Sequence, residues 1–274
     1  WDKRASIRTI PRRVLSFSSG QTYFPKHEQP LCSHPLIVSL GCDVQQYILI
    51  QTAYKFMFGI SEHETRVVTT AVQKLLCSNI PLPSTLKKAL QTVIIDESYH
   101  AMVAYDFIGQ VEAITGEKML PFPQDSDLGL ALEQRLKRLP DSMHDSFMFI
   151  AVCIAENLIT QELMTRQIDP NINPFFHQIN SDHLADEGRH AKLFTEVIKH
   201  LWSIFSLEEK QRIVSELPSF IETWMKRGVS LECDRMILQA LDLTEAQVEK
   251  VISDTYPELN FKTATEINPN IKHI

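Results

Sequence analysis

From about residue 35 onward, apolar residues recur every three or four positions along most of the chain. This spacing places them on one face of an α-helix, and no alternating pattern typical of strands competes with it. The pattern predicts four long helices, of up to about 30 residues, over residues 42–76 (in one piece or two), 84–116, 141–168 and 174–205. Shorter helices are predicted near 126–138 and across 207–252. Helices this long usually pack side by side, so we expect an all-α protein built around a helical bundle.

The two ends of the chain lack this periodicity. Residues 1–34 contain several Pro and Ser residues and are predicted to form an irregular N-terminal arm. The arm begins with five Lys or Arg against one Asp in WDKRASIRTIPRR, and we expect it to be solvated; the alternative is an arm that docks on the domain or on a partner. Residues 35–255 are predicted to form a single domain, and residues 256–274 an extended C-terminal tail.

Composition narrows the class of protein. The 274 residues are 44% hydrophobic and 22% charged, as in ordinary globular proteins. The net charge of −7 argues against a broad nucleic-acid-binding surface. The five cysteines are widely spaced and form no C-x-x-C motif, which argues against a disulfide framework and a zinc-thiolate site. The sequence shows no signal peptide and no apolar run long enough to span a membrane, so we expect a cytoplasmic protein.

One short motif occurs twice in the chain, as DESYH at residues 96–100 and as DEGRH at 186–190. In each copy a Glu and a His are three positions apart, so on a helix both side chains lie on one face and can reach the same point. The pairs are Glu97 with His100 and Glu187 with His190. Carboxylate and imidazole ligands suit iron or manganese, whereas a set richer in thiolates would suit zinc.

Two such pairs are too few for a site with two metal ions, because ferritin-like di-metal bundles use a further Glu from each of two more helices. Glu156 is one candidate, since it lies in the apolar stretch FIAVCIAENLITQEL, 31 residues before Glu187. A carboxylate that faces the core is costly unless it is paired, protonated or bound to a metal.

The first half of the chain offers two candidates, Glu62 and Glu64. Glu64 shares a helix face with apolar residues such as Val68 and lies 33 residues before Glu97, so we choose Glu64. A capping box with Ser61, in SEHE, would explain Glu64 structurally, but an unbroken helix through this position would exclude it. Two halves of this kind, packed about a pseudo-twofold axis, predict a di-metal site with four carboxylates and two imidazoles.

Three more residues accompany the two motifs. His183 lies seven positions before His190, two helical turns away on the same face, and is either an additional ligand or a donor beside the site. Asp96 and Asp186 each precede the His of their motif by four positions. Metal-bound histidines usually donate their other N–H to a carboxylate, and these two aspartates are the expected acceptors.

The complete pattern, Glu, Glu-x-x-His, Glu and His-x3-Glu-x2-His, resembles the AurF-type arylamine N-oxygenases over residues 35–205. The matching residues would be Glu64, Glu97, His100, Glu156, His183, Glu187 and His190. The resemblance implies a ferritin-like four-helix core with additional helices, two iron ions, O2 as co-substrate and oxidation of an amine nitrogen toward hydroxylamine and nitro products. Because the chain lacks a nicotinamide or flavin fingerprint such as G-x-G-x-x-G, the electrons would come from an external reductase or electron-transfer protein.

The residues alone leave other di-metal proteins open. A ribonucleotide reductase small subunit would need a radical tyrosine, but Tyr105 lies five residues after His100, off the metal face, and is expected to be structural. An iron-storage ferritin is shorter than this chain, and acyl-carrier desaturases lack an obvious counterpart of His183. A hydroxylase on the same scaffold is a further alternative. Bundles of this class often form homodimers, although no interface is visible in the sequence.

The expected substrate is a small primary amine, above all an aromatic one, held in an apolar cavity beside the metals. The candidate lining residues lie on or near the metal-bearing helices, and they are Met57, Phe58, Tyr99, Met102, Val103 and Phe149. Ordinary core packing is the alternative explanation of each. Lys55 and Arg66 flank the first ligand and are candidate cations for a substrate carboxylate.

Overall fold

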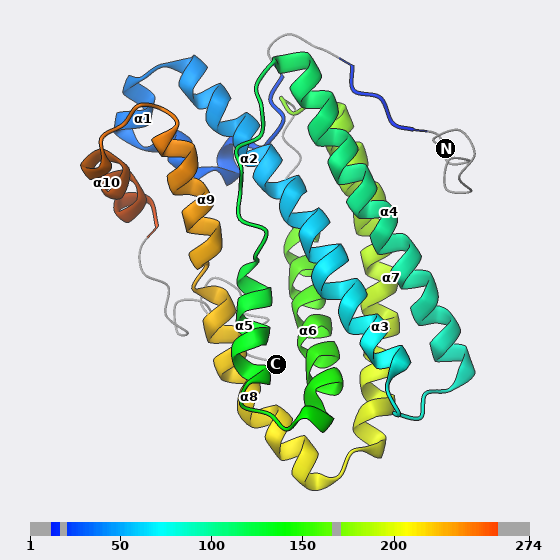
Figure 1. Ribbon diagram of the computed structural model, residues 1–274. Coiled ribbons are helices and arrows are strands. Elements are labelled where there is room, and N and C mark those ends of the chain that lie inside the picture. The colour runs from blue at the N-terminus through cyan, green and yellow to red at the C-terminus, as the bar shows by residue number, and fades with distance from the viewer. Residues whose placement is uncertain (1–11, 17–20, 166–170, 257–274) are drawn as a thin grey trace.

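The structure is a computed structural model that describes residues 12–16, 21–165 and 171–256. Four long helical stretches lie side by side in it (Figure 1). They are α2 (Cys42–Glu62) continued by α3 (Thr69–Cys77), α4 (Ser84–Thr115), α6 (His144–Thr165) and α7 (Pro174–Ile204). The described residues form no strand, and one isolated bridge pairs Thr22 with Ile172. The prediction of an all-α fold with a ferritin-like core is confirmed.

Shorter helices surround this four-helix core. At one end of α2 lie α1 (Pro35–Ser39), α9 (Gly228–Gln239) and α10 (Glu245–Thr255), and α9 packs along α2 (Figure 1). On another side, α5 (Asp127–Leu136) and α8 (Leu207–Met225) pack on each other and against α6. Short 3-10 helices cover Lys26–Glu28, Pro30–Ser33 and Asp141–Met143. The shorter helices predicted after residue 207 are therefore present as α8, α9 and α10.

A π-helical segment, His63–Val68, joins α2 and α3 into one continuous helical rod. A π segment has wider turns than an α-helix, and such segments often occur at functional sites. Ser61 lies inside the rod, where its hydroxyl donates to the carbonyl of Phe58 (2.9 Å). No helix begins at residue 61, so the capping-box explanation of Glu64 is excluded.

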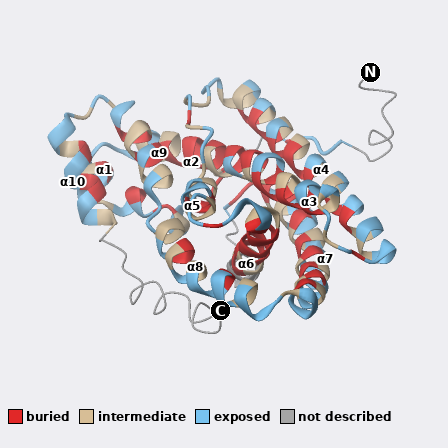
Figure 2. Cartoon of the chain, turned by 60° about the horizontal axis from the view of Figure 1, so that its bottom comes forward, coloured by how far each residue is buried: buried red, intermediate tan, exposed pale blue. Residues whose placement is uncertain are grey.

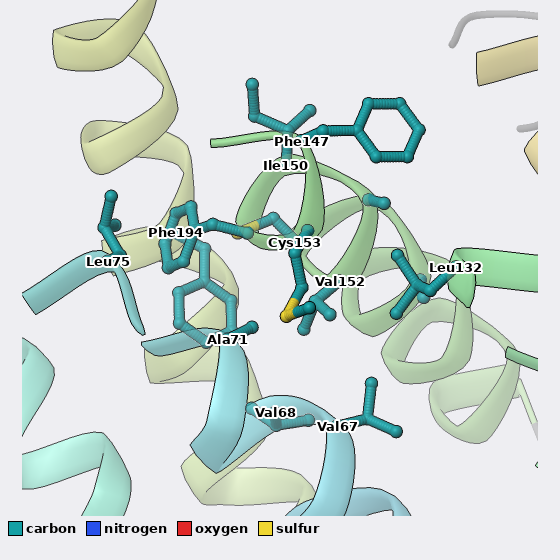
Figure 3. Close-up of a cluster of buried hydrophobic side chains, with 14 of the residues drawn as sticks. Val67, Val68, Ala71, Leu75, Leu132, Phe147, Ile150, Val152, Cys153 and Phe194 are labelled. Atoms are coloured by element: carbon teal, nitrogen blue, oxygen red, sulfur yellow. The ribbon is translucent and has the colours of Figure 1, made fainter. Parts of the chain in front are cut away.

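Apolar side chains form two cores at different levels of the bundle. The first gathers around α3, α5, α6 and α8 and includes Val68, Ala71 and Phe194 (Figure 3). The second gathers around α2, α9 and α10 and includes Tyr54 and Phe107. The buried positions follow the inward faces of the helices, while the outer faces are exposed (Figure 2).

The long helices α4 and α7 pass from one core to the other. In α4, Val93 belongs to the first core and Ala104 to the second. In α7, Ile179 belongs to the second core and Phe194 to the first. The stretches between these residues carry both copies of the repeated motif, so the motifs lie in a layer between two apolar cores.

Helix α6 is the most apolar of the long helices. The stretch Asp141–Ile159, which begins in the preceding 3-10 helix and covers most of α6, is the one described stretch that is long and apolar enough to cross a membrane by length and composition alone. However, 67% of that stretch is buried inside the protein, which is the burial of a core helix. Its apolar side chains are accounted for by the first core.

The described part of the N-terminal arm docks on the bundle. The guanidinium of Arg12 donates to Asp106 on α4 (2.8 Å), and that of Arg13 donates to Asp182 on α7 (2.8 Å). Between the arm and α4, the buried Leu15 donates its backbone N–H to the side chain of Gln110 (2.7 Å). Residues 12–16 therefore follow the alternative of an arm that docks on the domain, although all of their side chains except that of Leu15 are exposed. The predicted tail, apart from its first residue, lies outside the described residues.

Candidate metal centre

Seven buried polar side chains fill the layer between the two cores, each at most 8% exposed. The π segment supplies Glu64, α4 supplies Glu97 and His100, α6 supplies Glu156, and α7 supplies His183, Glu187 and His190. The structure therefore brings together, from four helical stretches, the seven residues predicted to be ligands.

One group in this layer consists of Glu64, His100, His183 and Glu187, whose ligand-type atoms all lie within 4.8 Å of one another. The Nε2 of His183 lies 3.3 Å from Oε1 of Glu64 and 3.2 Å from Oε1 of Glu187. The Nδ1 of His100 lies 3.4 Å from the same Glu187 oxygen. Oxygen and nitrogen atoms that converge in this way could hold a metal ion.

A second group consists of Glu97, Glu187 and His190, again with ligand-type atoms within 4.8 Å of one another. The Nδ1 of His190 lies 3.1 Å from Oε1 of Glu97 and 3.3 Å from Oε1 of Glu187. Glu187 belongs to both groups, so the two candidate metal positions adjoin and share a carboxylate. The layer is thus less symmetric than two identical halves would make it.

Glu156 lies near both groups but, among the described residues, belongs to neither. Its Oε1 instead contacts Nε2 of His63, the residue before Glu64 on the π segment. The sequence pattern did not point to His63, because consecutive residues of a regular helix face directions roughly 100° apart. In the wider π turn both His63 and Glu64 line the site, and no local sequence signal identified this segment.

Each aspartate of the repeated motif faces the histidine of the other copy. The Nε2 of His100 lies 3.1 Å from Oδ2 of Asp186, and the Nε2 of His190 lies 3.2 Å from Oδ2 of Asp96. Because these contacts engage Nε2, the Nδ1 atoms of both rings are left to face the carboxylates of the layer. Such a contact selects one tautomer and fixes the orientation of the ring.

Several inward atoms of the layer have no hydrogen-bond partner within the described part of the chain. They are Oε2 of Glu64, Oε1 of Glu97, Nε2 of His183, both carboxylate oxygens of Glu187 and Nδ1 of His190. A buried polar group left unsatisfied costs roughly 1–3 kcal/mol, so several together are unusual. The Nε2 of His183 and the Nδ1 of His190 lie close to carboxylates without the alignment of hydrogen bonds, as expected for atoms that point at a common centre. The Nδ1 of His100, by contrast, contacts Oε2 of Glu97 at hydrogen-bond distance (3.0 Å). This donor set fits bound cations.

Two of the carboxylates are difficult to ionise in the absence of added positive charge. Burial, and then the nearby carboxylates of Glu97 and Glu156, raise the pKa of Glu64 well above its ordinary value. Burial likewise raises the pKa of Glu156 to about 7, although the neighbouring His63 acts in the opposite direction. A cation in this layer would favour the ionised form of both groups.

The other carboxylates rely on histidines for their positive charge. Burial acts to raise the pKa of Glu97, but contacts with His100 and His190 outweigh it and lower this pKa to about 2. Burial acts to lower the pKa of His190, but Glu187 and Glu97 raise it to about 11. Binding of a metal to such an imidazole releases the proton that it holds.

Glu62, the alternative first ligand, is also buried but has other partners. Its Oε1 accepts from the hydroxyl of Tyr105 (3.0 Å), and its Oε2 pairs with Nε of Arg66 (2.5 Å). Within the described residues it belongs to neither group of ligand-type atoms. Tyr105 is 49% exposed and links α4 to α2 through this contact, which supports its structural interpretation.

A cleft of about 840 Å³ reaches this layer. Its inner end is lined by His63, Glu64, Glu156, His183 and Glu187, and its outer part lies between α2 and α9. None of the six residues predicted to line the cavity lines this cleft. Three of them are packed in the apolar cores: Met57 and Phe58 lie on a different face of α2 from the cleft, and Phe149 lies on α6 in the first core. For these three residues, ordinary core packing is the correct explanation.

The two predicted cations differ in their position. Lys55 lines the cleft, but its ammonium group is held by Asp234 (2.8 Å) and by the carbonyl of Ser230 (2.9 Å). Arg66 does not line the cleft and pairs with Glu62. Arg227, an exposed residue that the sequence pattern did not single out, lines the cleft from the start of α9. Only folding brings Arg227 near the first ligand helix, so no local signal could have identified it.

Comparison with known proteins agrees with this site. A family model described as p-aminobenzoate N-oxygenase AurF matches residues 10–268. The 4-aminobenzoate N-oxygenase of Streptomyces thioluteus is 22% identical over 243 residues, which are 84% of this chain and 70% of that protein. The family match includes all four ligand-bearing helices and the cleft. The chain therefore belongs to the AurF family of p-aminobenzoate N-oxygenases.

Proposed function

We propose that this protein is a non-haem di-iron oxygenase that uses O2 to oxidise the nitrogen of a small amine, most simply an arylamine. Membership of the N-oxygenase family identifies it as an oxygenase. The observation that carries the finer proposal is the pair of buried ligand groups that share Glu187 at the inner end of an open cleft. This arrangement would give two adjoining metal positions and a route for a substrate to reach them.

The charges and atom types of the layer favour two divalent cations. Four buried carboxylates carry four negative charges when ionised, and two divalent cations would balance them. Oxygen and imidazole nitrogen ligands without thiolates suit iron, with manganese as the alternative. Glu64, His100 and His183 would hold one ion, and Glu97 and His190 the other, with Glu187 between them. Glu156 would become a further metal ligand once its carboxylate turns away from His63.

When bound, the iron ions would supply the activation of O2. The balanced reaction of a primary amine to a hydroxylamine consumes one O2, two electrons and two protons and releases one water. Because the sequence has no nicotinamide or flavin fingerprint such as G-x-G-x-x-G, an external reductase or electron-transfer protein would deliver the electrons. Further rounds of the same reaction lead from the hydroxylamine toward the nitro product.

The protein's own residues would position the ligands and the substrate. Asp96 and Asp186 orient the histidines, and the two apolar cores exclude water from both sides of the layer. Phe24, Phe56 and Ile60 give the cleft an apolar wall suited to an aromatic ring. The relative from Streptomyces thioluteus is named for 4-aminobenzoate, so this compound belongs in any panel of trial substrates.

Oxygen-18 labelling tests the proposal. The iron-loaded protein is supplied with a chemical reductant, labelled O2 and a panel of aryl and alkyl amines, and the products are analysed by mass spectrometry. We expect heavy oxygen on nitrogen, and no product from the Glu64→Ala variant. Label on carbon would indicate a hydroxylase, an alkene product a desaturase, and iron uptake without any product a storage protein. Each of these results would overturn the proposal.

A further inference from the structure

One stripe of residues along α2 and the start of the π segment lines the cleft. Thr52, Phe56, Gly59 and His63 follow one another at intervals of three or four residues, and all four line the cleft. This spacing places them on one face of the helix. Gly59 lies in the middle of this stripe, one helical turn before His63, and is the position in the stripe that has no side chain.

Neither backbone conformation nor packing requires a glycine at this position. Gly59 lies inside α2, and the described glycines with positive φ are Gly41 and Gly116. A Cβ atom built at Gly59 would meet no atom within 4 Å apart from those of its own helix backbone and chain neighbours, so no packing neighbour excludes a side chain here. Glycine weakens a helix interior relative to alanine. At this position the absence of a side chain leaves open space in the cleft.

The size of that space indicates the size of its ligand. The cleft of about 840 Å³ lies toward the upper end of the range of roughly 300–1,000 Å³ that is typical of pockets for drug-sized molecules. It is far larger than one aromatic ring with an amino group needs. Phe24 and Phe56, whose ring centroids are 5.8 Å apart in an edge-to-face arrangement, add aromatic surface to the wall beside Gly59.

We propose that Gly59 is a specificity-determining residue that keeps the cleft open for an arylamine with more than one ring. The amino group would reach the inner end of the cleft, and the second ring would lie over Gly59 against Phe56. This inference rests on the proposed function for the identity of the reacting group, an amine. The open space at Gly59, by contrast, is a property of the cleft whatever reaction takes place there.

Binding measurements test the proposal without turnover. The iron-loaded protein is titrated with aniline, a one-ring probe, and with 4-aminobiphenyl, a two-ring probe, by calorimetry under anaerobic conditions. The wild-type protein is expected to bind 4-aminobiphenyl more tightly than aniline. Gly59→Leu should weaken binding of 4-aminobiphenyl by at least roughly tenfold and that of aniline by less than about threefold. Gly59→Ala, the second variant, adds a single methyl group. Its affinity for 4-aminobiphenyl should therefore lie between those of the wild type and Gly59→Leu.

Gly109 provides the matched control. It is also exposed within a long helix, a Cβ there would meet nothing within 4 Å, and it does not line the cleft. Gly109→Leu should therefore leave the binding of both probes unchanged. Equal losses for both probes in Gly59→Leu, unchanged binding of 4-aminobiphenyl, or a wild-type preference for aniline would each overturn the proposal. If 4-aminobiphenyl binds as expected but no amine is oxygenated on supplying O2 and reductant, the proposed function fails while the assignment of Gly59 stands.

Discussion

The Oδ2 atom of Asp96 lies 3.2 Å from the Nε2 atom of His190, although 94 residues separate the two in the chain. The reciprocal contact joins Asp186 to His100. Each copy of the repeated motif therefore orients the histidine of the other copy. The two halves of the candidate site hold each other in place, and neither half could form its geometry alone.

Removing the charge of Asp96 should weaken metal binding. In Asp96→Asn the ring of His190 loses its carboxylate partner, and loss of such an outer partner typically reduces metal affinity by roughly 10–100-fold. Competition with a chromogenic chelator measures the change. Asp106→Asn, on the same helix but paired with Arg12 away from the site, is the control and should bind metal as wild type does. Wild-type affinity in Asp96→Asn would show that the contact does not support the ligand.

The metal content is expected to be two irons per chain. Glu156→Ala or His190→Ala should lose at least one of them, because each removes a ligand of the proposed centre. Glu62→Ala is the matched control for Glu64→Ala: the first should keep both irons, since Glu62 contacts Tyr105 and Arg66, and the second should not. Elemental analysis after anaerobic loading with Fe(II) gives the count. A well-folded protein with one zinc per chain and no iron uptake would contradict the prediction.

His183 is expected to be a direct ligand. Its Nε2 faces the carboxylates of Glu64 and Glu187 without a hydrogen bond to either. His183→Ala should keep the helical content, measured by circular dichroism, and change the optical spectrum of the iron-loaded protein. A weaker metal affinity with an unchanged spectrum would instead place His183 beside the ligands, and a variant identical to wild type in spectrum and activity would remove it from the site.

Gly59→Ala should stabilise the protein. Alanine is favoured over glycine within a helix by about 1 kcal/mol, and the added methyl group meets no neighbour. For a chain of this size the gain should raise the melting temperature by about 2 °C. Thermal unfolding of the metal-free protein, with Gly109→Ala as a second exposed helical glycine, measures the effect. A lower melting temperature in Gly59→Ala alone would reveal a packing or backbone role that the structure does not show.

The sequence by itself determined the helices and the residues that were predicted to be ligands. Apolar residues at a spacing of three or four define a buried helix face, and a Glu or His on that face stands out because its burial is costly. Glu156 within an apolar stretch and the two Glu-x-x-His pairs were recognisable for this reason. Gly116, which ends α4 in a left-handed conformation (φ 78°), was likewise recognisable from local chemistry.

Tertiary structure alone decided the relations between helices. The contact of Asp96 with His190, the sharing of Glu187 and the contact of His63 with Glu156 depend on how helices distant in the chain approach one another. The cleft between α2 and α9 likewise depends on how these two helices, far apart in the chain, pack together. Helical periodicity fixes the face on which a side chain lies, but it carries no information about the partner or open space that this face meets after packing.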